Sequence, residues 1–347
     1  MEEGADVALT KLSLEKFTVF EKLDIEFSKG INVLIGENGT GKTHIMKVLY
    51  SACQAAQAKG TAIDFSTKMI KVFKPDDSGL HRLVKRENGA GTAKVKVCSD
   101  HHTLSLEFHS RRKENISVKG RDAWQEEFAG LTSTFIPAKE ILSNSHNLIQ
   151  AIDKGNVDFD DTYKDIISAA SVDITKGPEG GLKKKYLKSL QKITNGTVSI
   201  KNEEFYLKPG NQSMLEFQLI AEGIRKIALL WQLIKNGTLE NGSVLFWDEP
   251  EANINPKHIP ALVDILLNLQ SDGVQIFIAT HDYILAKYLE IKRTGGSSVL
   301  FHSLYKIENE DRVAHESNQN FRDLSNNVIT ESFNVLLDEI FNNDMED

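Results

Sequence analysis

A glycine-rich stretch near the N-terminus carries the residue types that bind phosphate. Residues 36–43 read Gly-Glu-Asn-Gly-Thr-Gly-Lys-Thr and fit the pattern G-x-x-x-x-G-K-[ST] at every fixed position. Backbone N–H groups of such a turn point inward, and the first turn of a following helix adds positive potential, so phosphate oxygens are held there. Lys42 is then expected on the β- and γ-phosphates and the Thr43 hydroxyl on Mg²⁺. The expected nucleotide-binding residues are Gly36, Asn38, Gly39, Gly41, Lys42 and Thr43.

Two carboxylates end a second apolar run about 200 residues later. Val244–Trp247 is followed directly by Asp248 and Glu249. A buried strand that stops at Asp248 brings that carboxylate to the Mg²⁺ site, and Glu249 then faces the γ-phosphate and polarises the attacking water as general base. A third apolar run, 274–279, ends two residues before His281, which can donate a hydrogen bond to the γ-phosphate. We expect Glu249 and His281 to be catalytic, and Thr43 and Asp248 to hold the metal.

The elements that must position these residues alternate between strand and helix. Apolar patterning predicts strands over 9–17, 23–27, 31–35, 131–136, 196–201, 204–208, 214–219, 243–248 and 274–279. Helical spacing predicts helices over 44–58 and 222–235 and a mainly helical stretch over 145–194. Phe17 and Phe20 are candidates for stacking on an adenine ring, with burial in the core as the alternative.

The remaining segments predict an inserted sheet and a C-terminal extension. Strand-like runs over 68–74, 80–85, 93–98 and 103–109 predict an antiparallel insertion. Residues 297–347 predict a strand pair, over 299–307 and 312–314, and an acidic amphipathic helix near 330–341. We expect this helix to pack on the core, with a docking surface for a partner as the alternative.

Composition restricts the class of protein. The chain has 347 residues with 40% hydrophobic and 26% charged residues, which is ordinary for a globular protein. No apolar run reaches membrane-spanning length, and the N-terminus lacks a secretory pattern. Cys53 and Cys98 show no CxxC spacing, so neither a zinc site nor a disulfide framework is expected. These features predict a cytoplasmic protein without a membrane partner.

The charge distribution is uneven. The formal net charge is −8, yet residues 60–121 hold 13 Lys and Arg against 7 Asp and Glu. Such asymmetry indicates a surface for a polyanion or an acidic partner, and DNA binding through residues 82–121 is one hypothesis. A solvated sheet with mixed charges is the alternative.

Together, these motifs resemble the ABC-type ATPases, in particular the RecF/SMC-like branch, over nearly the whole chain. Residues 36–43 are similar to the Walker A motif, Val244–Glu249 to Walker B with its catalytic glutamate, and His281 to the switch histidine. Residues 251–256 lie where that family has its D-loop, and Ala221–Lys226 where it has its signature loop.

The resemblance implies how the site is completed. In that family two subunits sandwich two ATP molecules, so a homodimer or higher homo-oligomer is expected, with Gly223 and Arg225 reaching the γ-phosphate of the other subunit; Lys226 is a further candidate. Ala221 lacks the usual serine hydroxyl, and Lys139 and Glu140 stand where a glutamine usually closes the metal site. Both departures predict a slow, switch-like ATPase.

A narrower resemblance comes from three segments, Phe135–Glu140, Ala221–Lys226 and Phe246–Asn253. They look like the AAA-family, overcoming-lysogenization-defect-related ATPases of bacterial antiphage systems, of which PtuA of Septu and AriA of PARIS are relatives. This implies a sensor or scaffold that controls a separate effector, usually a nuclease. A RecF-like DNA-binding repair ATPase and a non-hydrolysing, ATP-gated interaction module are the alternatives.

The expected architecture is therefore an α/β, ABC-ATPase-like P-loop nucleotide-binding domain with an antiparallel β insertion and a helical lobe. The predicted division is a split ATPase core (1–60 and 197–310), an antiparallel β lobe (61–136), a helical lobe (137–196) and an acidic helical C-terminal segment (311–347).

Overall fold

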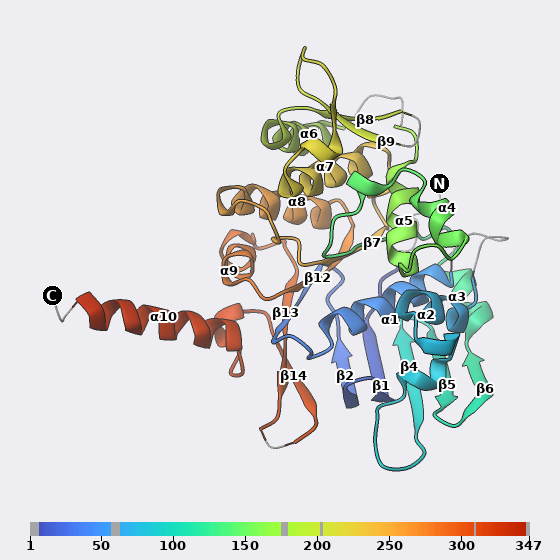
Figure 1. Cartoon of the computed structure of the whole chain (residues 1–347). Coiled ribbons are helices and arrows are strands. Elements are labelled where there is room, and N and C mark those ends of the chain that lie inside the picture. The colour runs from blue at the N-terminus through green and yellow to red at the C-terminus, as the bar shows by residue number, and fades with distance from the viewer. Residues whose placement is uncertain (1–6, 57–62, 175–179, 202–203, 309, 345–347) are drawn as a thin grey trace.

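Three sheets organise the chain. The computed structural model describes residues 7–56, 63–174, 180–201, 204–308 and 310–344, and Figure 1 shows their arrangement. Within these described ranges, no helix has both the length and the apolar composition needed to span a bilayer.

A six-stranded sheet carries the sequence motifs. All its neighbouring strands are parallel except the pair β13 and β14. Every residue of β3, β11 and β12 is buried, as their continuous apolar runs predict for the centre of a parallel sheet. The carboxyl ends of these three strands meet at one edge, where the three motifs lie. In spatial order the strands are β14 (Val313–Asn318), β13 (Val299–Lys306), β3 (Ile31–Gly36), β12 (Gln275–Thr280), β11 (Val244–Asp248) and β7 (Ser133–Ile136).

The two faces of this sheet belong to two hydrophobic cores. Successive side chains of a strand point to opposite faces, and on β3 Val33 packs into one core and Leu34 into the other. The first core also contains buried residues of helices α7 (Glu222–Lys235), α8 (Ile259–Ser271) and α9 (Tyr283–Lys292). The second contains residues of α1 (Lys42–Gln54) and of the second sheet, so the helix that follows the glycine-rich loop is held between the two sheets.

The second sheet is antiparallel and has five strands. Phe17 and Phe20 both lie in its core with 0% of their surface exposed, so neither is open to an adenine ring, and the alternative of burial in the core is confirmed for both. In spatial order the strands are β2 (Phe20–Glu26), β1 (Lys11–Phe17), β4 (Thr92–Cys98), β5 (Thr103–His109) and β6 (Arg112–Lys119). The sheet therefore combines the first two strands of the chain with the inserted ones.

Two segments predicted as strands are helical instead. Residues 68–73 lie in α2 (Phe65–Phe73), Lys74 is the residue that ends it, and residues 80–85 overlap the 3-10 turn η2 (Leu80–Leu83). The Asp64 carboxylate accepts hydrogen bonds from two backbone N–H groups of the first turn of α2, which is a strong signal for helix initiation. The strand prediction is wrong because a short apolar run does not distinguish helical from strand periodicity, and the capping Asp64 lies before that run.

The stretch predicted to be mainly helical, 145–194, is helical, and a small antiparallel sheet follows it. The stretch holds α4 (Leu148–Asp153), α5 (Asp161–Ala170) and α6 (Gly181–Thr194), and the sheet holds β8 (Thr197–Lys201), β9 (Glu204–Lys208) and β10 (Leu215–Glu216). Helix α3 (Arg121–Glu127) was not predicted, and the strand predicted over 214–219 is only partly formed, because residues 217–219 make a 3-10 turn. The strand predicted over 131–136 is β7 and lies in the parallel sheet, not in the antiparallel one. The domain boundaries themselves stay a prediction.

The last helix, α10 (Val328–Asp344), leaves the body of the molecule, as Figure 1 shows in red. Its first turns contact α9 and β3, whereas Val335, Leu336, Ile340 and Phe341 are 46–65% exposed. The helix prediction is correct, but the expectation that it packs on the core is wrong for the outer turns.

Candidate functional site

The loop between β3 and α1 has the backbone geometry of a phosphate cradle. Gly36 and Gly41 have φ values of 142° and 92°, in the region that favours glycine. A Cβ at Gly36 would lie 2.1 Å from the carbonyl oxygen of Leu304, and one at Gly41 would lie 2.4 Å from the Phe20 ring. Glycine is therefore required at both positions by conformation and by space. Gly41 caps α1 without a side-chain hydrogen bond, which leaves the helix N-terminus open to an anion.

Lys42 is held inside this loop. Its Nζ donates to the carbonyl oxygens of Gly36 at 2.7 Å and Glu37 at 2.9 Å. Burial lowers the pKa of the ammonium, while Asp248 and Glu249 nearby act in the opposite direction. Asn38 and Gly39 form the exposed tip of the loop. The ammonium thus lies at the base of the cradle, close to where phosphate oxygens would bind.

Thr43 and Asp248 meet although 205 residues separate them. The Thr43 Oγ1 donates to Asp248 Oδ2 at 2.9 Å. The two side chains meet because β3 and β11 flank β12 and all three strands run parallel. Burial raises the pKa of the Asp248 carboxyl, and a bound cation would counteract that cost.

This pair fits Mg²⁺. A hydroxyl and a carboxylate are the oxygen ligands that Mg²⁺ accepts, and Mg²⁺ usually keeps waters and substrate phosphate oxygens in its other positions. Among the described residues no group of three or more His, Cys, Asp or Glu could hold a metal by itself. A cation at Thr43 and Asp248 would therefore need a nucleotide to complete its ligand set.

Glu249 stands at a strained turn beside His281. Its φ of 48° lies in the left-handed region, which is costly for a non-glycine residue. Its N–H donates to the Ala279 carbonyl at 2.9 Å. Its carboxylate oxygen Oε1 lies 3.2 Å from His281 Nδ1, and the two side chains are 32% and 54% exposed. The turn thus presents both side chains at the strand ends, next to Asp248.

Lys226 contacts the backbone of this turn. The sequence suggested it as a phosphate donor, but the structure corrects this, because its side chain is only 1% exposed. Its Nζ donates to the Glu249 carbonyl oxygen at 3.3 Å, and burial lowers the pKa of the ammonium. The sequence did not indicate this inward-facing role, because the resemblance to a signature loop suggested a residue that faces outward.

Gly223 and Arg225, the other expected contacts to a second subunit, are engaged within the chain. A Cβ at Gly223 would lie 2.2 Å from the Asn253 carbonyl oxygen, so the start of α7 packs closely on the loop after β11. Arg225 Nε donates to Glu140 Oε2 at 2.5 Å, and the guanidinium also donates to the Phe217 and Ile220 carbonyls. Their contact with a nucleotide stays a prediction, and for Arg225 it requires release of Glu140.

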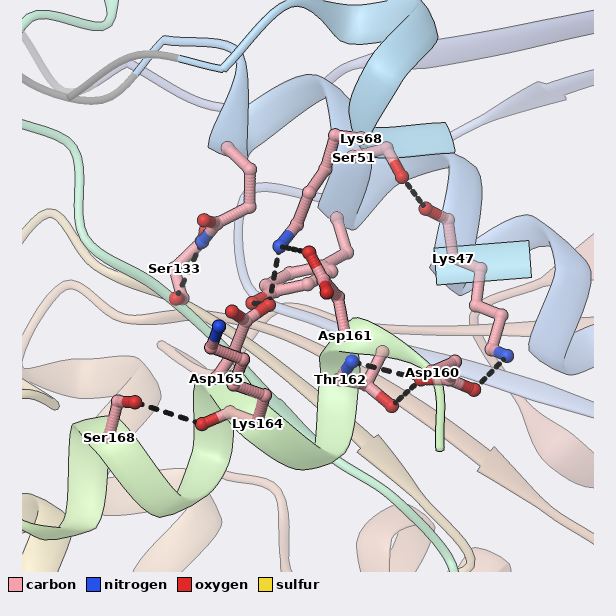
Figure 2. Close-up of polar contacts among 12 residues, drawn as sticks. Lys47, Ser51, Lys68, Ser133, Asp160, Asp161, Thr162, Lys164, Asp165 and Ser168 are labelled. Atoms are coloured by element: carbon pink, nitrogen blue, oxygen red, sulfur yellow. Dashed lines mark hydrogen bonds and ion pairs between the residues drawn. The ribbon is translucent and has the colours of Figure 1, made fainter. Parts of the chain in front are cut away.

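A polar cluster that sequence analysis missed ties the helical segment to α1 and α2. Figure 2 shows Lys68 between Asp161 and Asp165 of α5, at 3.0 Å and 2.6 Å, with only 3% of the lysine side chain exposed. Lys47 of α1, one turn beyond the glycine-rich loop, pairs with Asp160 at 2.7 Å. The spacing of the two α5 carboxylates indicates a charged helix face, but a pairing across about 100 residues leaves no local signal.

Comparison with known proteins agrees with this geometry. A family model described as "AAA domain, putative AbiEii toxin, Type IV TA system" matches residues 98–286, more than half of the chain. The chain belongs to this AAA-domain family. DNA replication and repair protein RecF of Bacillus thuringiensis (strain Al Hakam) and of Bacillus cereus (strain B4264) are each 28% identical to it over 115 residues. Those matches cover 33% of this chain and 24% of each RecF, so the chain spans about a quarter of these relatives.

Solved structures show the same fold. A crystal structure of an SmcHead bound to the C-winged helix domain of ScpA has a TM-score of 0.56 at 13% identity, covering 89% of this chain and 97% of that one. The Smc head domain with an extended coiled coil bound to the C-terminal domain of ScpA, derived from Pyrococcus furiosus, has a TM-score of 0.54 at 11% identity, covering 96% and 99%. The expected ABC-ATPase-like fold is therefore confirmed, and it is the fold of these Smc head domains.

Proposed function

We propose that this chain binds ATP with Mg²⁺ at the carboxyl ends of β3 and β11 and hydrolyses it slowly. The observation that carries the proposal is the Thr43–Asp248 contact of 2.9 Å beside an open helix N-terminus. Lys42 and the loop N–H groups hold the phosphates, and Thr43 and Asp248 hold the metal, which supplies positive charge against the phosphate oxygens.

Glu249 is the proposed general base. As the water oxygen attacks the γ-phosphorus, the Glu249 carboxylate takes the proton of the water, and the bond to the β-phosphate breaks to release ADP. His281 Nδ1, 3.2 Å from Glu249 Oε1, orients that carboxylate and lies where it can donate to the γ-phosphate. Slow turnover follows from Ala221, which offers no hydroxyl, and from Lys139 and Glu140, which stand where a glutamine usually closes the metal site.

A second copy completes the proposed site. The start of α7 would approach the γ-phosphate of the partner subunit with Gly223 and Arg225, and Arg225 would exchange Glu140 for phosphate. ATP would therefore stabilise a dimer or higher oligomer. In this proposal the assembly acts as a sensor or scaffold for a separate effector, such as a nuclease, in antiphage defence. The AAA-domain family match supports the ATPase part of this role.

Binding of ATP with and without Mg²⁺ tests the site by calorimetry. Thr43→Val and Asp248→Asn are expected to lose the Mg²⁺-dependent part of the affinity, about tenfold or more, because each removes a ligand oxygen or its charge. Thr67→Val, at an exposed threonine of α2, is the matched control. If all four proteins showed the same dependence of ATP affinity on Mg²⁺, Thr43 and Asp248 would not be the metal ligands.

A RecF-like, DNA-binding function is the second candidate, because the RecF relatives match over 115 residues. Arg111 and Arg112 are exposed at the β5–β6 turn of the basic segment. Under this candidate, duplex DNA binds with strong salt dependence, and Arg111→Ala with Arg112→Ala reduces both the affinity and the salt slope. DNA binding that these two changes leave intact would contradict it.

A further inference from the structure

Helix α10 carries an apolar stripe beyond the body of the protein. Leu336 and Ile340 are spaced four residues apart, as are Leu337 and Phe341, so the apolar side chains follow one side of the helix. Leu336, Ile340 and Phe341 are 50%, 46% and 65% exposed. A soluble domain seldom presents large apolar side chains in such a row unless they meet a partner.

The inner end of α10 is firmly seated beside the nucleotide loop. The Phe333 ring stacks on Tyr283 with centroids 4.1 Å apart and planes 6° apart. Gly36, Asn38 and His281 line a hollow of about 440 Å³ together with Ile329 and Phe333 of the helix. The outer turns therefore project away from the body of the molecule, as Figure 1 shows, from an inner end that lies beside the phosphate loop.

The negative charge around the apolar stripe indicates which kind of partner can bind it. Residues 323–347 contain seven Asp and Glu and no Lys or Arg. Two copies of α10 packed on each other would bring these carboxylates together, and anionic lipid headgroups would repel them. A partner surface with a basic rim gains from the same charges.

The basic face of the antiparallel sheet does not fit α10. On the exposed side of the antiparallel sheet, Lys94, Lys96 and Lys119 surround a hollow, but the apolar residues beneath them, Val95 and Leu106, are at most 1% exposed. A second copy thus offers basic residues there without an accessible apolar floor. A surface that binds the stripe needs both basic residues and an accessible apolar floor.

We propose that the outer turns of α10 dock into a groove on a separate protein, with an apolar floor and a rim of Lys or Arg. This rests on the proposed scaffold role and names its docking element. The binding mode is that of an amphipathic helix in a groove, with Leu336, Leu337, Ile340 and Phe341 as anchors and Asp338 and Glu339 meeting the rim.

Two synthetic helical peptides of about 14 residues (roughly four turns) probe this surface on the full chain by fluorescence anisotropy. One presents a leucine face flanked by lysines, and its counterpart carries glutamates instead. The lysine peptide is expected to bind, more weakly at higher salt, and the glutamate peptide not to bind. The variant Leu336→Asn with Ile340→Asn is expected to bind at least about tenfold more weakly.

The matched control is Leu219→Asn with Ile291→Asn, which changes two apolar residues that are 73% and 62% exposed elsewhere. It is expected to bind the lysine peptide as the unsubstituted chain does. Equal loss in both variants, equal binding of both peptides, or an oligomer that only the α10 variant dissociates would overturn the proposal. Phosphate release, measured in parallel, tests the ATPase separately, because none of these four residues belongs to the nucleotide site.

Discussion

Burial of Glu251 predicts a specific dependence of stability on pH. Its Oε1 accepts a hydrogen bond from Thr280 Oγ1 at 2.6 Å, and its Oε2 is buried and meets no donor among the described residues. Burial raises the pKa of this carboxyl from the ordinary value of 4.5 to about 6. The folded chain therefore binds more protons than the unfolded chain between those two values.

The sign and size follow from linkage. A folded-state pKa above the unfolded one stabilises the protein at low pH, and this stabilisation is lost as pH rises from about 4.5 to about 6. A pKa difference of about 1.5 corresponds to about 2 kcal/mol of unfolding free energy in total. Roughly 1 kcal/mol of this lies between pH 5 and pH 8.

Glu251→Gln removes the titration and keeps the oxygen that Thr280 needs. We compare the free energy of unfolding of the variant with that of the unsubstituted chain, measured by urea unfolding at pH 5 and at pH 8. The difference is expected to shift in favour of the variant by about 1 kcal/mol from pH 5 to pH 8. Glu331→Gln, at an exposed carboxylate, is the control and should show no such gain. A difference between Glu251→Gln and the unsubstituted chain that does not change with pH would refute the reasoning.

Two further substitutions test the supports of the site. Lys226→Met removes the donor 3.3 Å from the Glu249 carbonyl oxygen. We expect phosphate release to slow about tenfold at unchanged ATP affinity, since a hydrogen bond from a charged group contributes about 1.5–3 kcal/mol. Unchanged phosphate release would show that the Glu249 turn does not depend on Lys226. Lys68→Met leaves Asp161 and Asp165 unpaired, which we expect to cost about 3 kcal/mol in urea unfolding. Adding Asp161→Asn and Asp165→Asn should recover most of that loss; no recovery would refute the ion-pair account.

The nucleotide loop and the carboxylates could be predicted because their residue types recur at set spacings next to strands. Gly36 and Gly41 need their backbone angles, and Asp248 follows a run that is buried on both faces of a sheet. Because β3 and β11 run parallel on either side of β12, Thr43 and Asp248 then come together at the same edge of the sheet. This part of the site is a consequence of local patterns and sheet topology.

The supporting contacts lacked such a pattern. Lys68 pairs with Asp165 across 97 residues, and Arg225 with Glu140 across 85, so no local spacing indicates either pair. The inward direction of Lys226 depends on how α7 packs against the turn after β11, which single-residue patterns do not give. The projection of α10 was missed because an amphipathic pattern reports an apolar face but not what covers it.

ATP hydrolysis in a single turnover tests the central claim most directly, with the unsubstituted chain compared with Glu249→Gln, each in excess over ATP so that all ATP is bound, and with Mg²⁺ present. We predict that both proteins bind ATP equally and that Glu249→Gln releases phosphate at least about 100-fold more slowly. Equal rates would remove Glu249 as the base. Tight ATP binding without phosphate release from the unsubstituted chain would contradict hydrolysis and favour an ATP-gated interaction module.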